Sequence, residues 1–184
     1  MHTENSASFE SFLRSMLGLV EDVSDPGSQK AALSFFSRCV AVWGQPLSQP
    51  SSAPNGHPES QGLPGFDRFI YEQLVPTAFA VPSLPEFNLK DGQMLVVCCF
   101  QSGASFQALM CFIFKVLHEI ANLLQTIVKV REHEAQTYFA TAFLPSKGWP
   151  SNAAIDFSTK LRELDSKSFR KYFTDLIRES RSSS

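Results

Sequence analysis

The chain has 184 residues, of which 43% are hydrophobic and only 18% charged, and these proportions exclude a disordered acidic or basic tail. Lys and Arg number 16 against 18 Asp and Glu, so the chain lacks the strongly basic balance that is usual for nucleic-acid binders. Its 17 Phe outnumber 2 Trp and 3 Tyr, which favours packed interiors over a wet, hydrogen-bonding surface.

The N-terminal part is predicted to be a pair of helices. Apolar residues recur at steps of three and four over residues 9–20, which indicates an amphipathic helix. The Asp-Pro-Gly sequence at 25–27 is a turn that ends this helix. A second helix is expected from about Ser28, with Gly44 at the position of a C-terminal cap. Residues 1–44 are therefore predicted to be one HEAT-like helix pair.

Residues 45–63 predict an exposed, mobile linker. Pro, Ser, Gly, Asn and Gln dominate this stretch, and no apolar period survives in it. Its Pro-x-x-x-Pro spacing also suits a polyproline II ligand, but a tolerated surface insertion is the simpler interpretation.

Helical periods resume after the linker. A third helix is predicted from Phe66 to Phe79, and Pro76 is expected to kink or break it because proline removes a backbone donor. Asn88 or Asp91 is positioned to cap the next helix.

Four further helical stretches are predicted in the rest of the chain. The apolar periods cover residues 116–128, 135–142 (ending at Pro145), 154–164 and 169–177. Asp165 or Ser166 is expected to cap the last helix. The apolar stripe of that helix consists of Phe169, Tyr172, Phe173, Leu176 and Ile177.

These patterns predict an all-α fold, since no stretch alternates with the period of two that a strand requires. Successive helices of this length suggest antiparallel pairs of about 40–47 residues, the size of HEAT or armadillo units. Periodicity alone does not distinguish an α-solenoid from a globular helical bundle.

One stretch has the length of a membrane span. Residues 94–114 carry no charge, and their length would let them cross a bilayer. Polar residues such as Gln101 and Gln107 lie in the middle, so a buried segment is the favoured interpretation and no membrane contact is expected.

Motifs for catalysis and metal binding are absent. The chain has no phosphate-binding P-loop and no HExxH zinc motif, and His118-Glu119 lacks the second histidine. His133 stands between Glu132 and Glu134, but on a helix these three side chains point in different directions. We therefore expect no catalytic residue, no metal site and no cofactor, and hence no enzyme.

The C-terminal helix carries a local positive ridge. At 100° per residue, Lys167, Lys171 and Arg178 align opposite the apolar stripe, with Thr174 on the same side. Such a ridge could contact phosphates, because each Lys or Arg that binds one releases counterions. An ordinary solvated helix face is the alternative interpretation.

Residues 65–93, GFDRFIYEQLVPTAFAVPSLPEFNLKDGQ, resemble the C-terminal region of exportin-T, the tRNA nuclear export receptor of the importin-β superfamily. The resemblance rests on residues in one register, namely Gly65, Phe66, Phe69, Tyr71, Val75, Pro76, Phe79, Pro82, Phe87, Leu89, Asp91 and Gln93. Elsewhere the stretches 42–44, 119–124, 144–145 and 168–173, together with Tyr138, also fit this family.

The resemblance implies an α-solenoid of HEAT repeats that is a transport receptor. Receptors of this family bind Ran-GTP through N-terminal repeats, bind tRNA, pass nuclear pore proteins, and shuttle between nucleus and cytoplasm. Residues 64–184 are expected to be the C-terminal HEAT-like repeats of such a receptor, and the Ran-binding repeats to be absent from this chain. Charge placement makes the candidate tRNA contacts Lys160, Arg162, Lys167, Arg170, Lys171 and Arg178.

One segment departs from the family's pattern. The family's helix runs directly from residues 94–97 into 119–121, whereas residues 98–118 intervene in this chain. Our hypothesis is that residues 98–118 are an insertion.

A second function class, a helical protein–protein scaffold without nucleic-acid binding, has the same fold and stays open.

Overall fold

The computed structural model describes residues 2–46, 62–84, 87 and 105–182. Within these residues every regular element is helical and none is a strand, so the predicted all-α class is confirmed. The elements in chain order are α1 (His2–Glu21), α2 (Pro26–Trp43), α3 (Phe66–Phe69), the π-helical turn η1 (Ile70–Leu74), α4 (Val75–Ala80), the 3-10 turn η2 (Val81–Ser83), α6 (Ser105–Thr137), the π-helical turn η3 (Tyr138–Phe143), α7 (Leu144–Ser146), α8 (Ser151–Glu163) and α9 (Ser166–Ser182).

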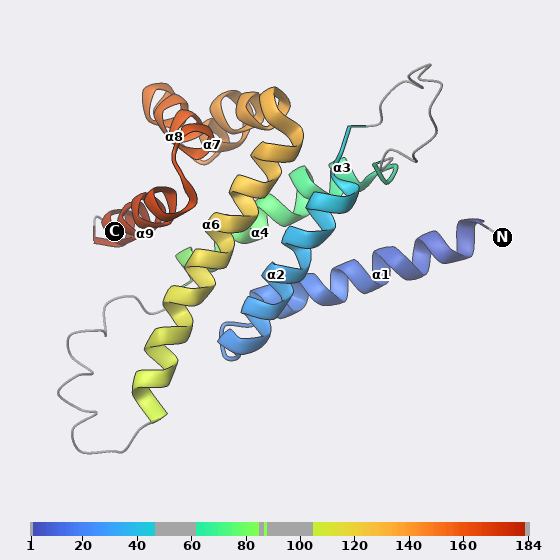
Figure 1. Cartoon of the computed structure of the whole chain (residues 1–184), viewed down its shortest axis with the longest axis horizontal. Helices are drawn as coiled ribbons and strands as arrows, with labels where there is room; N and C mark the ends of the chain where they lie inside the picture. The colour runs from blue at the N-terminus through green and yellow to red at the C-terminus, as the bar shows by residue number, and fades with distance from the viewer. Residues whose placement is uncertain (1, 47–61, 85–86, 88–104, 183–184) are drawn as a thin grey trace.

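The long helix α6 runs through the middle of the molecule, as Figure 1 shows. It packs along α2 on one side and against α8 and α9 on the other. Helix α1 pairs with α2. The arrangement agrees with a stack of helix pairs, as in an α-solenoid fragment. The boundaries proposed at residues 44 and 63 stay predictions.

Two aspartates cap helices in the same way. Asp25 accepts from the backbone N–H of Gly27 and Ser28, each at 3.1 Å, and from the Ser28 hydroxyl at 2.6 Å. As a result α2 begins at Pro26, two residues earlier than the apolar period suggested, because a proline at the first turn loses no helical bond. Asp165 repeats the pattern at α9, and this decides between the two predicted caps.

Of the kink or break expected at Pro76, the break does not occur. The backbone stays helical on both sides of it, and the π-turn η1 lies directly before it. The Val75 N–H donates to the Ile70 carbonyl, five residues back instead of four, and this wider turn accommodates the missing donor. The π-turn η3 stands before Pro145 in the same way, and the helix ends at Ser146, one residue past the predicted end at that proline.

The two π-turns lie against each other. The carbonyl of Tyr71 loses both possible helical donors, because the Val75 N–H bonds to Ile70 and Pro76 has no N–H. The Tyr138 hydroxyl donates to this carbonyl at 2.7 Å, and the two tyrosine rings are 4.6 Å apart between centroids. A side chain from one π-turn thus replaces the backbone bond that the other has lost.

Phenylalanine rings form much of the core. Phe79 on α4 contacts four of them, with centroid distances of 6.2, 5.0, 5.8 and 6.0 Å to Phe139, Phe143, Phe157 and Phe173. These rings come from α4, η3, α8 and α9, so one residue joins distant parts of the chain. The excess of Phe over Tyr and Trp is accordingly used for packing.

Helix α6 confirms the apolar period read from residue 116 onward. Its fully buried apolar side chains are Val116, Leu117, Ile120, Ala121, Leu123, Leu124, Ile127 and Ala135. The helix kinks at Glu132, whose φ of 42° and ψ of −116° are not helical. The preceding residue, Arg131, is 9% exposed and donates to the Gly44 carbonyl at 3.2 Å, which ties the end of α2 to α6.

Some expectations fall on residues outside this description. They are the central part of the predicted linker (47–61), the possible caps Asn88 and Asp91, and most of the uncharged segment before α6. Residues 105–118 belong to α6, and the hypothesis that 98–118 is an insertion stays a prediction. Among the described helices, none combines the length and apolarity needed to cross a membrane.

Candidate nucleic-acid interface

Helix α9 packs on α6 through the stripe expected from the sequence. Phe169 and Phe173 are fully buried, and Ile177 is nearly so. Thr174 corrects one detail of the predicted ridge, since it is only 6% exposed although it was placed on the solvent side. Its hydroxyl donates to the Arg170 carbonyl at 2.8 Å, and α9 packs against both α6 and η2.

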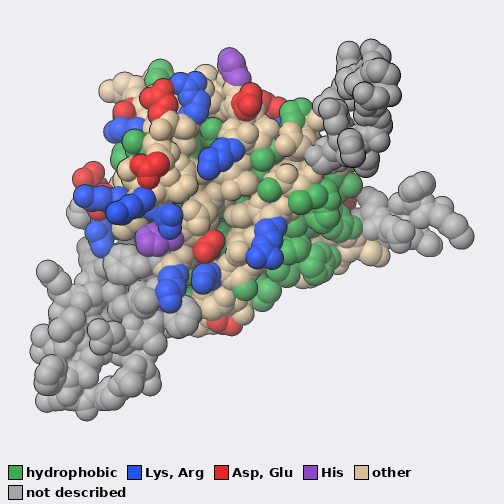
Figure 2. All heavy atoms as spheres, viewed as in Figure 1, with side chains coloured by type: hydrophobic (Ala, Val, Ile, Leu, Met, Phe, Trp, Pro, Cys, Tyr) green, Lys and Arg blue, Asp and Glu red, His purple; other side chains and the backbone are tan. Residues whose placement is uncertain are grey.

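Two cations of the ridge are available to a ligand. Lys167 and Lys171 are exposed on α9, one helical turn apart. Within the described part of the chain, neither ammonium group forms an ion pair or a hydrogen bond. Figure 2 shows Lys and Arg side chains gathered on the surface at the α9 end of the molecule.

Three other candidates are already paired with acids. Lys160 donates to Asp156 at 2.8 Å, and this bond raises the pKa of the lysine. The same ammonium lies 4.5 Å from the centroid of the Tyr172 ring, a cation–π contact that joins α8 to α9. Arg162 and Arg178 also pair with neighbouring carboxylates. Arg162 lies 2.8 Å from Glu163, and Arg178 lies 3.4 Å from Asp175. A phosphate would have to compete with these acids.

Arg170 makes a hydrogen bond within its own helix. It is partly buried, and its Nε donates to the Ser166 carbonyl at 2.8 Å. The pKa of His118 on α6 is lowered, first by burial and second by the nearby charge of Arg170. His118 is a neighbour of the ridge that sequence reasoning missed, since the contact joins residues of two different helices far apart in sequence.

Glu132, His133 and Glu134 are not arranged as a metal site. Glu132, His133 and Glu134 are all exposed around the kink, and His133 Nδ1 lies 2.8 Å from the Thr137 hydroxyl. In the part of the chain that the structure describes, no three His, Cys, Asp or Glu side chains are grouped to hold a metal ion.

Comparison with known proteins identifies the family. A family model described as Exportin-T matches residues 1–181 of the chain. The chain belongs to the Exportin-T family. The predicted resemblance is therefore confirmed, and it extends from the stretch around Tyr71 to nearly the whole sequence.

Curated Exportin-T proteins of fungi are close relatives. The protein of Coprinopsis cinerea is 59% identical over 179 residues, which are 97% of this chain and 15% of the relative. That of Laccaria bicolor is 58% identical over the same shares, and that of Mycosarcoma maydis is 36% identical over 97% of this chain and 14% of its own length. This chain thus spans only about 15% of the length of the relatives it matches. No solved structure matches it.

Proposed function

We propose that this chain is a tRNA-binding part of a nuclear export receptor, and that α9 with the adjoining face of α8 contacts tRNA phosphates. Membership in the Exportin-T family supports the substrate class. The observation that carries the proposal is the pair Lys167 and Lys171, which are exposed on one face of α9 without acidic partners among the described residues.

The recognition that we propose is of backbone shape and charge. An ammonium group is a compact point charge that can meet a phosphate oxygen in many orientations, so it adds affinity without reading a base. A-form RNA helices are recognised mostly by such backbone contacts and by shape. Lys160, Arg162, Arg170 and Arg178 would contribute less, because each is already held by a carboxylate or a carbonyl.

The remaining partners belong to the same proposal. In the longer receptor, Ran-GTP would bind repeats outside residues 1–184, and nuclear pore proteins would contact the full-length protein during shuttling between nucleus and cytoplasm. No bond is made or broken in tRNA by this chain, so its role is that of a carrier and not of an enzyme. The isolated chain is then expected to bind tRNA weakly and without dependence on Ran-GTP.

The test is a filter-binding comparison of tRNA with heparin. The triple variant Lys167→Ala, Lys171→Ala, Arg178→Ala should bind tRNA about tenfold more weakly than the unchanged chain. Lys129→Ala with Lys147→Ala is the control, because both lysines are exposed and neither lies on α9. Equal tRNA affinity of the triple variant and the unchanged chain would refute the assignment of the ridge.

A protein–protein scaffold is the second candidate function. It is favoured by large apolar side chains exposed on the α1–α2 pair, where Phe12 is 47%, Leu19 40% and Val42 53% exposed. Figure 2 shows hydrophobic side chains collected on this end of the molecule. If tRNA and heparin bound equally weakly and neither responded to the triple variant, the scaffold function would be the better account.

A further inference from the structure

The cationic surface of α9 continues onto α6 where the two helices pack together. Arg170 lies about one helical turn after Lys167, so these two side chains are neighbours on the surface of α9. Arg170 is partly buried whereas Lys167 is exposed, which puts Arg170 on the flank of α9 beside its packed face. His118 lies on α6, near enough for the charge of Arg170 to act on its imidazole. The contact between the two helices therefore adds a histidine to the cations of the ridge.

Arg170 and His118 both keep groups that a ligand can use. The Nε of Arg170 donates to the Ser166 carbonyl at 2.8 Å, which fixes the guanidinium group. In the described part of the chain, its two terminal nitrogens form no ion pair or hydrogen bond. The imidazole of His118 is partly exposed and has no hydrogen-bond partner among the same residues. A phosphate would therefore displace no bonded carboxylate from either group.

The charges around His118 determine how it responds to a bound phosphate. Burial first and the charge of Arg170 second lower the pKa of the imidazole, and Glu119, the next residue of α6, raises it to a smaller extent. Lys115 is exposed about one turn earlier on the same helix. A phosphate beside Arg170 brings negative charge that opposes the effect of the arginine, so it favours the protonated form of His118. Binding and protonation are then linked.

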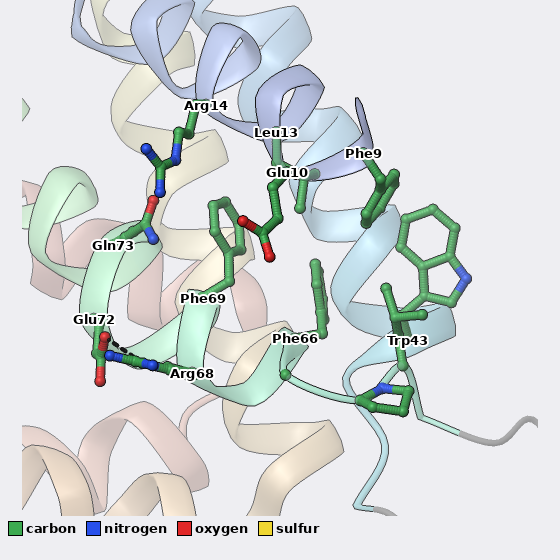
Figure 3. A pocket seen from close by; sticks show the side chains of 13 residues that line it. Phe9, Glu10, Leu13, Arg14, Trp43, Phe66, Arg68, Phe69, Glu72 and Gln73 are labelled. Atoms are coloured by element: carbon green, nitrogen blue, oxygen red, sulfur yellow. Dashed lines mark hydrogen bonds and ion pairs between the residues drawn. The ribbon is translucent and has the colours of Figure 1, made fainter. Parts of the chain in front are cut away.

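A groove at the opposite end of the molecule has a different distribution of charge. It lies between α1 and the α3–η1 helix, and Figure 3 shows that two acids and two bases line it, namely Glu10, Glu72, Arg14 and Arg68. Because these charges balance, the groove has no excess of positive charge that would attract a phosphate. Arg14, which lies away from α9 in Figure 1, is for this reason a suitable control for Arg170.

We infer that His118 belongs to the tRNA contact and takes up a proton from solvent when a phosphate binds beside Arg170. The proton adds to the unprotonated ring nitrogen, and the imidazolium N–H then donates to a phosphate oxygen, as does a terminal N–H of Arg170. The inference rests on the proposed function, since it requires tRNA at the ridge. It adds a consequence that the lysines do not produce, because they stay charged near neutral pH, namely an affinity that rises as the pH falls.

Fluorescence anisotropy with labelled tRNA, at constant salt concentration, tests this dependence between about pH 7.5 and about pH 5.5. We expect the unchanged chain to bind about fivefold more tightly at the lower pH. His118→Gln should bind equally at both, with the affinity that the unchanged chain has at the higher pH. His133→Gln is the matched control, because His133 is exposed at the kink of α6, and it should keep the fivefold gain.

The juxtaposition of His118 and Arg170 can be tested without tRNA. NMR follows the ring signal of His118 through a pH titration, and His118→Gln assigns it. Arg170→Gln should raise the midpoint of this titration, because the charge that disfavours the imidazolium is removed. Arg170→Lys retains that charge and should keep the midpoint low, as should Arg14→Gln. Circular dichroism checks that each variant is folded.

The possible outcomes separate this inference from the proposed function. A pH-dependent gain that persists in His118→Gln overturns the inference, and so does a midpoint that Arg170→Gln leaves unchanged. If Lys167→Ala with Lys171→Ala weakens tRNA binding but the unchanged chain binds equally at both pH values, the inference fails and the proposed function holds. If the chain does not bind tRNA, or the lysine variant binds it as well as the unchanged chain does, both fail.

Discussion

At the scale of single residues, the pair Tyr71 and Tyr138 shows how a local backbone defect is compensated. Pro76 and the π-turn before it leave the Tyr71 carbonyl without a helical donor, and the Tyr138 hydroxyl supplies one at 2.7 Å. The hydroxyl of Tyr71, by contrast, is buried near Arg131 and Glu134, but no hydrogen bond of good geometry holds it in the described part of the chain. Replacement by phenylalanine is therefore expected to have opposite effects on stability at the two positions.

Removing the Tyr138 hydroxyl should destabilise the chain. Tyr138→Phe leaves a partly buried carbonyl without a donor, and we expect the free energy of unfolding to fall by about 1–2 kcal/mol in urea denaturation. Tyr71→Phe is the matched control and should leave the stability unchanged or raise it, because it removes an unsatisfied polar atom. Equal losses in the two variants would contradict this account of the π-turns.

The Asp165 cap should make the stability of α9 depend on pH. Hydrogen bonds from Ser168 and Lys167 hold the pKa of Asp165 below its ordinary value of 3.8. A lowered pKa in the folded state means that the stabilisation is complete above the pKa of the unfolded chain and is lost as the pH falls through the folded pKa. Asp165→Ala should accordingly lower Tm at pH 7, and its difference from the unchanged chain should shrink below about pH 4.

Thermal melts followed by circular dichroism from pH 7 to pH 3 measure this effect. Asp165→Asn is the control, since asparagine also caps helices but does not titrate. It should retain most of the stability at pH 7 and show a smaller change with pH. A Tm difference for Asp165→Ala that stays constant over the whole range would speak against the carboxylate as the cap.

At the scale of elements, the kink in α6 predicts opposite effects of glycine at adjacent positions. Glu132 has a φ of 42°, a conformation that costs a residue with a Cβ atom more than it costs glycine. Glu132→Gly should therefore leave the free energy of unfolding unchanged or raise it by up to about 1 kcal/mol. His133→Gly, next to the kink in a helical conformation, should lower it by about 1 kcal/mol. Urea denaturation of both variants measures these free energies. A larger loss of stability for Glu132→Gly than for His133→Gly would contradict this account of the kink.

Much of this element structure could be predicted from the sequence, because amphipathic periods and caps are local. The stripes of α6, α8 and α9 and the cap Asp165 follow from residues a few positions apart. The continuation of the helix through Pro76 could not, since it depends on a π-turn whose lost bond is supplied from elsewhere in the chain. The burial of Thr174 is likewise a tertiary feature, which the helical period of α9 does not contain.

At the scale of the whole molecule, the family and the positive ridge could be predicted, but the strength of each candidate contact could not. Helical geometry placed Lys167 and Lys171 on the solvent face, as the structure has them. Ion pairs decide which cations are available, and Arg162 illustrates this, since it bonds both Glu163 and Gln136 of another helix. The proximity of Arg170 to His118 is a tertiary feature without a local signal.

The salt dependence of tRNA binding tests the central claim most directly. Each lysine that binds a phosphate releases counterions and adds about one to the slope of log K against log salt concentration. Fluorescence anisotropy with labelled tRNA, at salt concentrations from about 50 to 200 mM, should show a slope smaller by about two for Lys167→Ala with Lys171→Ala. Lys129→Ala with Lys147→Ala should keep the slope of the unchanged chain. If the two double variants gave the same slope, α9 would not be the tRNA contact.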